Sequence, residues 1–231
     1  YMTAIFLIIW TLVQLSRLKG QKLKRFVNFT LVSILSALSS LFMLLPTYLD
    51  LKTHGETFTN IVNLKTEDSW YLDFFAKNLV GSFDTTKFGS IPMISVGLVP
   101  LILALLFFTL KSIKPIVKLS YSLFFTLIIS SFYLQPLNLF WQGMHAPNMF
   151  LYRYAWVLSI GIIYLAAETV VRLDQINLKH FTLVISFLFI GFLSTYFFKN
   201  HYDFLVDVNF LLTLEFLIAY FILFIVILGY K

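Results

Sequence analysis

One short polar stretch between two apolar runs holds the residue types in this chain that are best suited to chemistry. It reads FWQGMHAPNMFLYRY and covers residues 140–154. Arg153 carries a planar fork of donors that fits a phosphate or a carboxylate. His145 lies eight residues earlier, and Gly143 and Pro147 favour a turn that folds it back beside Arg153. The stretch therefore predicts a site for an anionic group. The alternatives are an interfacial anchor for Arg153 and a structural or merely exposed imidazole for His145.

Three more side chains of this stretch are candidate contacts to a substrate. Aromatic rings such as Trp141 and Tyr152 usually belong to the belt at a membrane surface, but either ring could stack on a sugar. Asn148 is typical of a turn or a helix cap, and its amide could also hold a substrate. The candidate substrate-binding residues are therefore Trp141, His145, Asn148, Tyr152 and Arg153.

Acidic residues form the second group of candidates. Glu215 is predicted to lie about two turns inside the last apolar run, where an ionisable group usually faces a cavity or a partner. Glu67 and Asp68 could supply a general base or bind a divalent metal, although such a pair more often caps a helix. These three residues are candidate pocket-lining groups. Glu168 lies one turn before Arg172, and an i, i+4 ion pair explains it without a function.

The composition places these candidates in a membrane protein. Of 231 residues, 59% are hydrophobic and only 12% are charged, against about 25% charged in soluble domains. The absence of cysteine excludes disulfides, thiolate metal sites and thiol catalysis. The net charge of +6 comes from residues in short loops, which indicates topology signals and not a nucleic-acid surface. No phosphate-binding loop, dinucleotide fingerprint or His-rich metal spacing is present.

The apolar runs predict an all-α polytopic membrane protein with about seven transmembrane helices in one membrane domain. Residues 46–90 are predicted to form an extracytoplasmic loop. The first run opens at once and is short, which indicates an internal piece of a longer protein. The predicted spans are 1–15, 26–45, 91–110, 119–139, 154–171, 181–198 and 209–230.

The charges between the runs predict the orientation. The loops expected inside carry ten Lys and Arg and one acid, whereas the outer segments carry six positive and eight acidic residues. The signs agree at every crossing, so the polar stretch at 140–154 is predicted to lie outside. Prolines modify two spans: Pro46 is expected to end the second, and Pro100 to kink the third near its middle.

The long outer segment predicts a short interfacial helix of about three turns. Residues 66–69 resemble a helix start. Apolar residues then recur at helical spacing, with Asp73 and Lys77 on the opposite side. The alternative is a small packed helix without lipid contact. The apolar positions are Trp70, Tyr71, Phe74, Phe75 and Leu79.

Four segments together resemble a known family. WQGMHAPNMFLYRYAWVLS at 141–159 is the most specific, because its aromatic, Gly, His, Pro-Asn and Tyr-Arg-aromatic pattern is too long to arise from hydrophobicity alone. With it, residues 1–174 resemble the YfhO family of bacterial membrane proteins. The other segments are YMTAIFLIIW at 1–10, LLPT at 44–47 and GSIPMISVGLVPLILALLFF at 89–108.

The resemblance implies a partial C-type glycosyltransferase (GT-C) fold in the plasma membrane of a Gram-positive bacterium. Such an enzyme moves a sugar from undecaprenyl phosphate onto lipoteichoic or wall teichoic acid at the outer face. The implied partners are membrane lipid, a polyprenyl-phosphate sugar and a teichoic acid acceptor, without nucleic acid. No cofactor is implied with certainty, and a divalent metal stays open. The motif positions carried over are His145, Pro147, Asn148 and Arg153.

The expected reaction is direct displacement at the anomeric carbon. The resemblance implies a general base in the first outer loop, upstream of Tyr1, and Arg153, with His145, would stabilise charge on the departing lipid phosphate. A transporter or flippase of lipid-linked sugars and a non-catalytic membrane scaffold are the alternatives. The polar residues cluster toward the outer side, which favours an outward-facing site.

Overall fold

The chain folds into helices joined by loops, as a computed structural model shows. The structure describes residues 2–54, 59–61, 63–66, 69–84, 89–147 and 150–229, and within them no strand forms beyond one isolated bridge between Lys65 and Leu134. The predicted all-α class is confirmed. The α-helices are α1 (Met2–Leu15), α2 (Lys22–Ser39), α3 (Leu41–His54), α4 (Asp73–Ala76), α5 (Leu98–Phe107), α6 (Pro115–Tyr133), α7 (Gln135–Trp141), α8 (Ala155–Val170), α9 (Leu178–Phe197) and α10 (Asp207–Gly229), with 3₁₀ turns η1 (Leu173–Gln175) and η2 (Lys199–His201).

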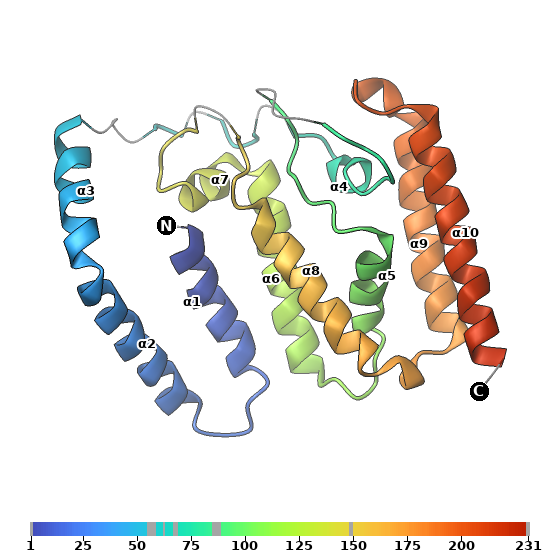
Figure 1. The fold of residues 1–231 in the computed structure, drawn as a ribbon, viewed down its shortest axis with the longest axis horizontal. Coiled ribbons are helices and arrows are strands. Elements are labelled where there is room, and N and C mark those ends of the chain that lie inside the picture. The colour runs from blue at the N-terminus through green and yellow to red at the C-terminus, as the bar shows by residue number, and fades with distance from the viewer. Residues whose placement is uncertain are drawn as a thin grey trace.

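The long helices run roughly side by side, so the connections gather at two opposite ends (Figure 1). The three basic connections, around residues 16–21, 108–114 and 171–177, all lie at the lower end. The α3–α4, α7–α8 and α9–α10 connections lie at the upper end, which we call the outer end. This arrangement agrees with the alternation predicted from the charges.

Three of the described helices are long and apolar enough to cross a membrane: α6, α9 and α10. The α2–α3 pair passes the same test together, but it is bent by 68°. Apolar helices α1, α5 and α8 are shorter, so the prediction of seven crossings is not confirmed by length and composition. The structure supports three or four candidate spans in a multi-pass membrane protein.

The second predicted span ends at a different place than expected. The break falls at Ser40, between the end of α2 and the start of α3, and Pro46 lies inside α3, which continues to His54. The hydroxyl groups of both serines donate back to carbonyls one turn earlier, at 2.9 Å to Leu35 and 3.0 Å to Ser36. Such back-bonding bends helices. The expectation that Pro46 ends the helix was therefore wrong.

The third predicted span is helical only in its inner part. Residues 91–97 are non-helical, and α5 starts after Gly97, whose φ of 82° suits glycine. Pro100 therefore lies in the first turn of α5 and does not kink the middle of a helix. Non-helical backbone at membrane depth is tolerated where protein covers it, and Ile94 in this segment is 1% exposed.

The predicted interfacial helix is one turn long, because α4 holds four residues. Its polar side chains, Asp73 and Lys77, are buried, although the helical pattern assigned them to the solvent side. Tyr71 is exposed, whereas Phe75 packs against Phe192 of α9. Partners far away in the sequence bind both polar groups, so their polarity did not predict their exposure. The predicted length of about three turns was therefore wrong, and α4 is a short helix packed against α9.

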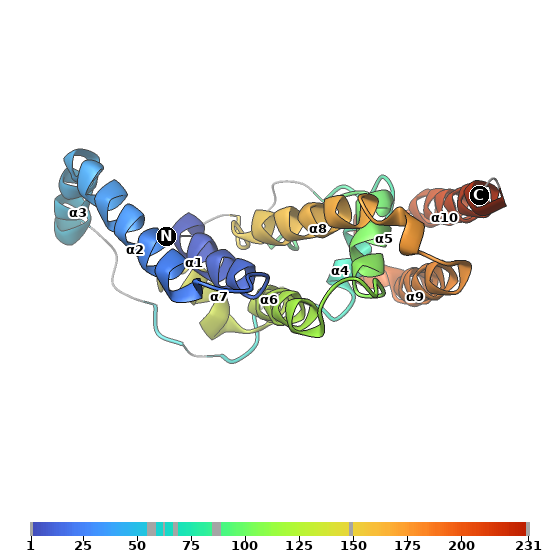
Figure 2. The ribbon, with the colours of Figure 1, turned by 90° about the horizontal axis from the view of Figure 1, so that it is seen from below.

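The core lies where α5 and α8 cross, flanked by α6 and α9 (Figures 1 and 2). Apolar burial drives association weakly in lipid, so close packing of small residues matters. A Cβ at Gly161 would lie 2.8 Å from Cε1 of Phe124, and one at Gly191 would lie 2.1 Å from Cε1 of Phe75. These glycines let aromatic rings lie against α8 and α9.

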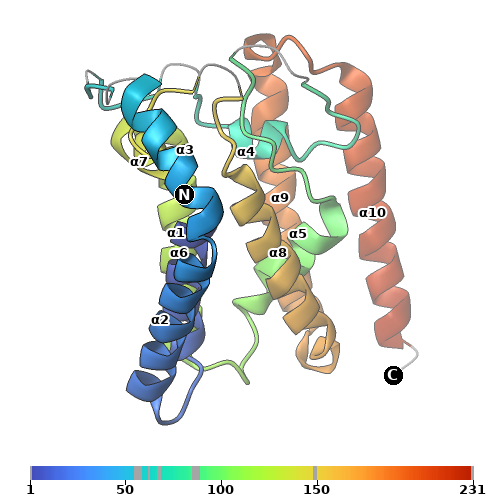
Figure 3. The same cartoon turned by 60° about the vertical axis from the view of Figure 1, so that its left-hand side comes forward.

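The bent α2–α3 pair lies at one edge of the molecule, as Figure 3 shows. None of the side chains of α2 is buried, and its described neighbours are α1 and α3. The opposite edge is formed by α9 and α10 (Figure 2). The outer connections therefore span the width of the bundle, and they position the polar groups described next.

Candidate functional site

The α7–α8 connection at the outer end is held in a tight, specific conformation. Gly143, Met144 and Phe150 all have positive φ angles, and the Met144 amide donates to Leu139 O at 2.8 Å. The amide nitrogen of Gln142 donates to Asn138 Oδ1 at 2.9 Å and to the Leu151 carbonyl at 2.7 Å. These bonds tie the end of α7 to the chain just before α8.

A residue of the preceding outer segment fastens the same connection from outside. The Thr59 amide donates to the Met144 carbonyl at 3.0 Å. The Ala146 amide donates to Thr59 Oγ1 at 2.8 Å. These two bonds flank His145 in the chain, so the backbone around the imidazole is fixed on both sides. Sequence analysis missed Thr59, because nothing in the pattern links it to a loop 87 residues later.

The folded connection surrounds an open cavity of about 490 Å³, which we call the Arg153 pocket. The partly buried His145 and the exposed Arg153 both line it, together with Gln142. The turn predicted from Gly143 and Pro147 thus brings the imidazole and the guanidinium to one cavity. The remaining lining residues are Met2, Thr3, Trp141, Ala146 and Pro147.

The predicted aromatic contacts have mainly packing roles. Trp141 borders the Arg153 pocket, but it is 1% exposed, stacks on Tyr154 at 5.3 Å and donates from Nε1 to Ser131 Oγ at 3.0 Å. Tyr152 is buried against Phe132 and lines a neighbouring cavity. Both rings therefore shape the walls and offer little free face to a sugar.

The other predicted site residues are not gathered at this pocket. Asn148, Glu67 and Asp68 lie outside the described residues. Glu215 is exposed on α10 and lines none of the three outer cavities described in this section.

A second outer cavity, of about 340 Å³, lies beside α4 and η2, and we call it the Asp73 pocket. Asp73 is 3% exposed and accepts hydrogen bonds from the Trp70 amide at 2.8 Å and the Tyr202 hydroxyl at 2.9 Å. Burial raises the pKa of the Asp73 carboxyl above its ordinary value, and the two donors oppose that rise. Burial and the adjacent carboxylate also raise the pKa of Tyr202.

A small cavity of about 140 Å³ adjoins the Asp73 pocket. Asp84 lines both the small cavity and the Asp73 pocket. Tyr152 lines the small cavity, and its chain neighbour Arg153 lines the Arg153 pocket. The outer end thus carries a hollow lined by Arg153 and His145, and a second hollow whose charged lining groups are mainly carboxylates.

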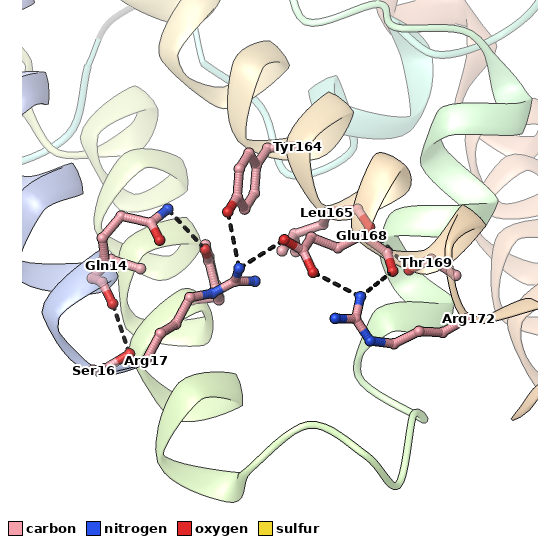
Figure 4. Close-up of polar contacts among 10 residues, drawn as sticks. Gln14, Ser16, Arg17, Tyr164, Leu165, Glu168, Thr169 and Arg172 are labelled. Carbon is pink, nitrogen blue, oxygen red and sulfur yellow. Dashed lines mark hydrogen bonds and ion pairs between the residues drawn. The ribbon is translucent and has the colours of Figure 1, made fainter. Parts of the chain in front are cut away.

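A polar cluster at the inner end joins α1 to α8 (Figure 4). Arg17 donates from Nη1 to Glu168 Oε1 at 2.7 Å and to the Tyr164 hydroxyl at 2.9 Å. Arg172 donates to Glu168 Oε2 at 2.7 Å, which confirms the i, i+4 pair predicted for these two residues. The Arg17 guanidinium also lies 5.3 Å from the Tyr121 ring centroid. Each carboxylate oxygen of Glu168 thus meets its own arginine.

The geometry of this inner cluster indicates a structural role. Nε and Nη2 of Arg17 are buried without a hydrogen-bond partner, so they are not open to a ligand. Sequence analysis counted Arg17 only as a topology signal. The ion pair with Glu168 spans 151 positions and was invisible to local patterns.

No group of three or more His, Cys, Asp or Glu within the described ranges is arranged to hold a metal ion. What the Arg153 pocket can do follows from its groups. A guanidinium and an imidazole around one open hollow can donate several hydrogen bonds to an anion, whereas the two N–H groups of the Gln142 amide are already engaged by Asn138 and Leu151. The α7–α8 connection that forms the hollow lies at the end of the bundle that the charge pattern predicts to face outward.

The family model described as bacterial membrane protein YfhO matches residues 1–231. The chain belongs to the YfhO family. The match includes α9 and α10, whereas the resemblance in the sequence covers only residues 1–174. This YfhO chain is therefore a multi-pass protein of a bacterial membrane. Comparisons with curated proteins and with solved structures find no match.

Proposed function

We propose that this YfhO chain is the lipid-phosphate-binding part of a membrane glycosyltransferase. The enzyme moves a sugar from undecaprenyl phosphate to lipoteichoic or wall teichoic acid on the outer face of the plasma membrane. The observation that carries the proposal is the placement of Gln142, His145 and Arg153 around one open cavity at the outer end. A polyprenyl chain would stay in the bilayer while its phosphate enters this hollow.

The reaction that fits is a displacement at the anomeric carbon. The bond between that carbon and a phosphate oxygen breaks, and a bond to the acceptor oxygen forms. The electron pair leaves with the phosphate, which gains a negative charge. Arg153 and His145 stabilise this charge as it develops, because they are positioned before the reaction begins. The acceptor proton passes to a carboxylate base.

We place that base in the outer segment that precedes α1 in the full-length protein. Met2 and Thr3, at the outer end of α1, line the Arg153 pocket. A carboxylate in residues just before them would lie near the same hollow. The base and the phosphate-binding groups would then come from two separate outer loops, and both loops would be needed for transfer.

The test is a transfer assay with purified full-length protein in detergent, a polyprenyl-phosphate hexose and lipoteichoic acid. We expect the hexose to appear on the polymer without a sealed membrane. A protein that moves lipid-linked sugar across vesicle membranes but forms no product in detergent would contradict the proposal and support a transporter. A preparation from which the segment before α1 has been removed is expected to form no product.

A further inference from the structure

The Asp73 pocket is built from four separate regions of the chain, one of which is the α4–α5 connection with Asp84. The segment before α4 contributes Lys65 and Trp70, α4 contributes Asp73, and the connection after η2 contributes Tyr202. Its lining segments, α4 and the α9–α10 connection, lie at the same end of the bundle as the α7–α8 connection (Figure 1). Neither the proposed phosphate binding nor the proposed base uses these residues.

The Asp73 carboxylate keeps capacity for hydrogen-bond donors. It has one donor on Oδ2, the Trp70 amide, and one on Oδ1, the Tyr202 hydroxyl. Each carboxylate oxygen has two acceptor positions, so one position on each oxygen remains. A buried carboxylate of this kind binds hydroxyl donors strongly, since water competes little there.

The second buried carboxylate has a cation behind it. Lys77 is 1% exposed, and its Nζ lies 3.7 Å from Asp84 Oδ2 and 3.2 Å from the Asp84 carbonyl oxygen. Asp84 also accepts from the Ile91 amide at 3.2 Å. Lys77 thus offsets the charge of Asp84, whereas the two hydrogen-bond donors that the described residues give Asp73 are neutral. The ligand-facing acceptor of the pocket is therefore Asp73.

An aromatic surface adjoins this acceptor. The Trp70 indole stacks on the His201 ring with centroids 4.5 Å apart, and it meets the Tyr202 ring edge-on at 5.9 Å. Trp70 is only partly buried. A sugar or polyol has apolar C–H groups on one side and hydroxyl groups at its rim. An aromatic face beside a hydrogen-bond acceptor complements both features.

We propose that the Asp73 pocket binds a hydroxyl-rich, uncharged unit, a sugar or a polyol, with Asp73 accepting its hydroxyls and Trp70 covering its apolar side. Carboxylates from Asp73, Asp84 and Asp203 line the cavity against one lysine, Lys65, and this excess of acids disfavours a phosphate in the pocket itself. The unit comes from the donor sugar or from the acceptor polymer. That the unit belongs to a donor lipid or to an acceptor polymer rests on the proposed function. The prediction that the pocket binds such a unit does not rest on it.

The test measures equilibrium binding of two probes to the full-length protein in detergent. The probes are lipoteichoic acid and a polyprenyl-phosphate hexose, each used alone. Asp73→Asn and Trp70→Leu are each expected to weaken the binding of one probe at least about tenfold, because the first removes a charged acceptor and the second removes the aromatic face. Weaker binding of lipoteichoic acid alone identifies the bound unit as part of the acceptor. Weaker binding of the polyprenyl-phosphate hexose alone identifies it as the donor sugar.

Tyr71→Leu is the matched control, because Tyr71 is an exposed aromatic next to Trp70 that does not line the pocket. It is expected to bind both probes like the parent. Thermal unfolding of each variant identifies a folding defect, and Trp70→Leu decides the question if Asp73→Asn does not fold. Unchanged binding of both probes in the folded variants would overturn the inference. If the parent transfers the sugar but the variants bind both probes normally, only the inference about the Asp73 pocket is refuted. If binding depends on Asp73 but the parent transfers no sugar, only the proposed function is refuted.

Discussion

Replacing Arg153 by alanine in the full-length protein is expected to lower the rate of sugar transfer about a hundredfold, which corresponds to about 3 kcal/mol of lost transition-state stabilisation. Arg153 is an exposed cation of the Arg153 pocket, and alanine offers no donor to the departing phosphate. Arg153→Lys keeps the charge but loses the planar fork, so its transfer rate should lie between the rates of the parent and of Arg153→Ala. Initial rates with the purified variants measure the effect.

The control for Arg153 is Lys52→Ala, which removes another exposed cation near the outer end of α3. It should keep the parental rate, because Lys52 does not line the Arg153 pocket. Membrane yield and thermal unfolding should match the parent for all three variants. A folded Arg153→Ala protein with nearly normal transfer would exclude the guanidinium from the reaction.

Replacing Glu168 by alanine is expected to destabilise the protein by about 2 kcal/mol. Breaking a buried ion pair typically costs about 3–5 kcal/mol, and the partial exposure of this cluster lowers that cost. The loss arises because Arg17 and Arg172 both donate to the missing carboxylate. Thermal unfolding in detergent should show a lower midpoint.

A double variant separates the ion pair from general damage at the inner end. Arg17→Gln combined with Glu168→Gln should cost less than the sum of the two single changes, because the double variant removes both charges of the Arg17–Glu168 pair and leaves only Arg172 without its carboxylate partner. Asp174→Ala is the matched control, since it removes an exposed acid at the same end. Equal midpoints for Glu168→Ala and Asp174→Ala would show that the cluster does not tie α1 to α8.

Topology was the most predictable property of this fold. Long apolar runs and the sign of the charges between them place every basic connection at one end, and the structure agrees. These signals are local, because each depends on one stretch of chain and its solvent. The helix starts and breaks were less predictable. The break at Ser39 and Ser40 and the late start of α5 at Gly97 depend on side-chain hydrogen bonds and on covering protein.

The candidate site divides in the same way. The pairing of His145 with Arg153 was predictable because a short turn connects them in the chain. The Asp73 pocket was not, because Asp73 and Tyr202 are 129 positions apart and the helical pattern placed Asp73 toward solvent. Trp141 and Tyr152 were predicted as sugar contacts from their type, but the burial that makes them wall residues depends on Phe132, Ser131 and Tyr154.

The binding of undecaprenyl phosphate, compared with undecaprenol, tests the phosphate role of the Arg153 pocket most directly. The two lipids differ only in the phosphate, so the ratio of their dissociation constants isolates its contribution. The full-length protein should bind the phosphate at least about tenfold more tightly, as expected for a charge-assisted contact. In Arg153→Ala this preference should largely disappear. Equal affinity for the two lipids, or an undiminished preference in the variant, would contradict the account.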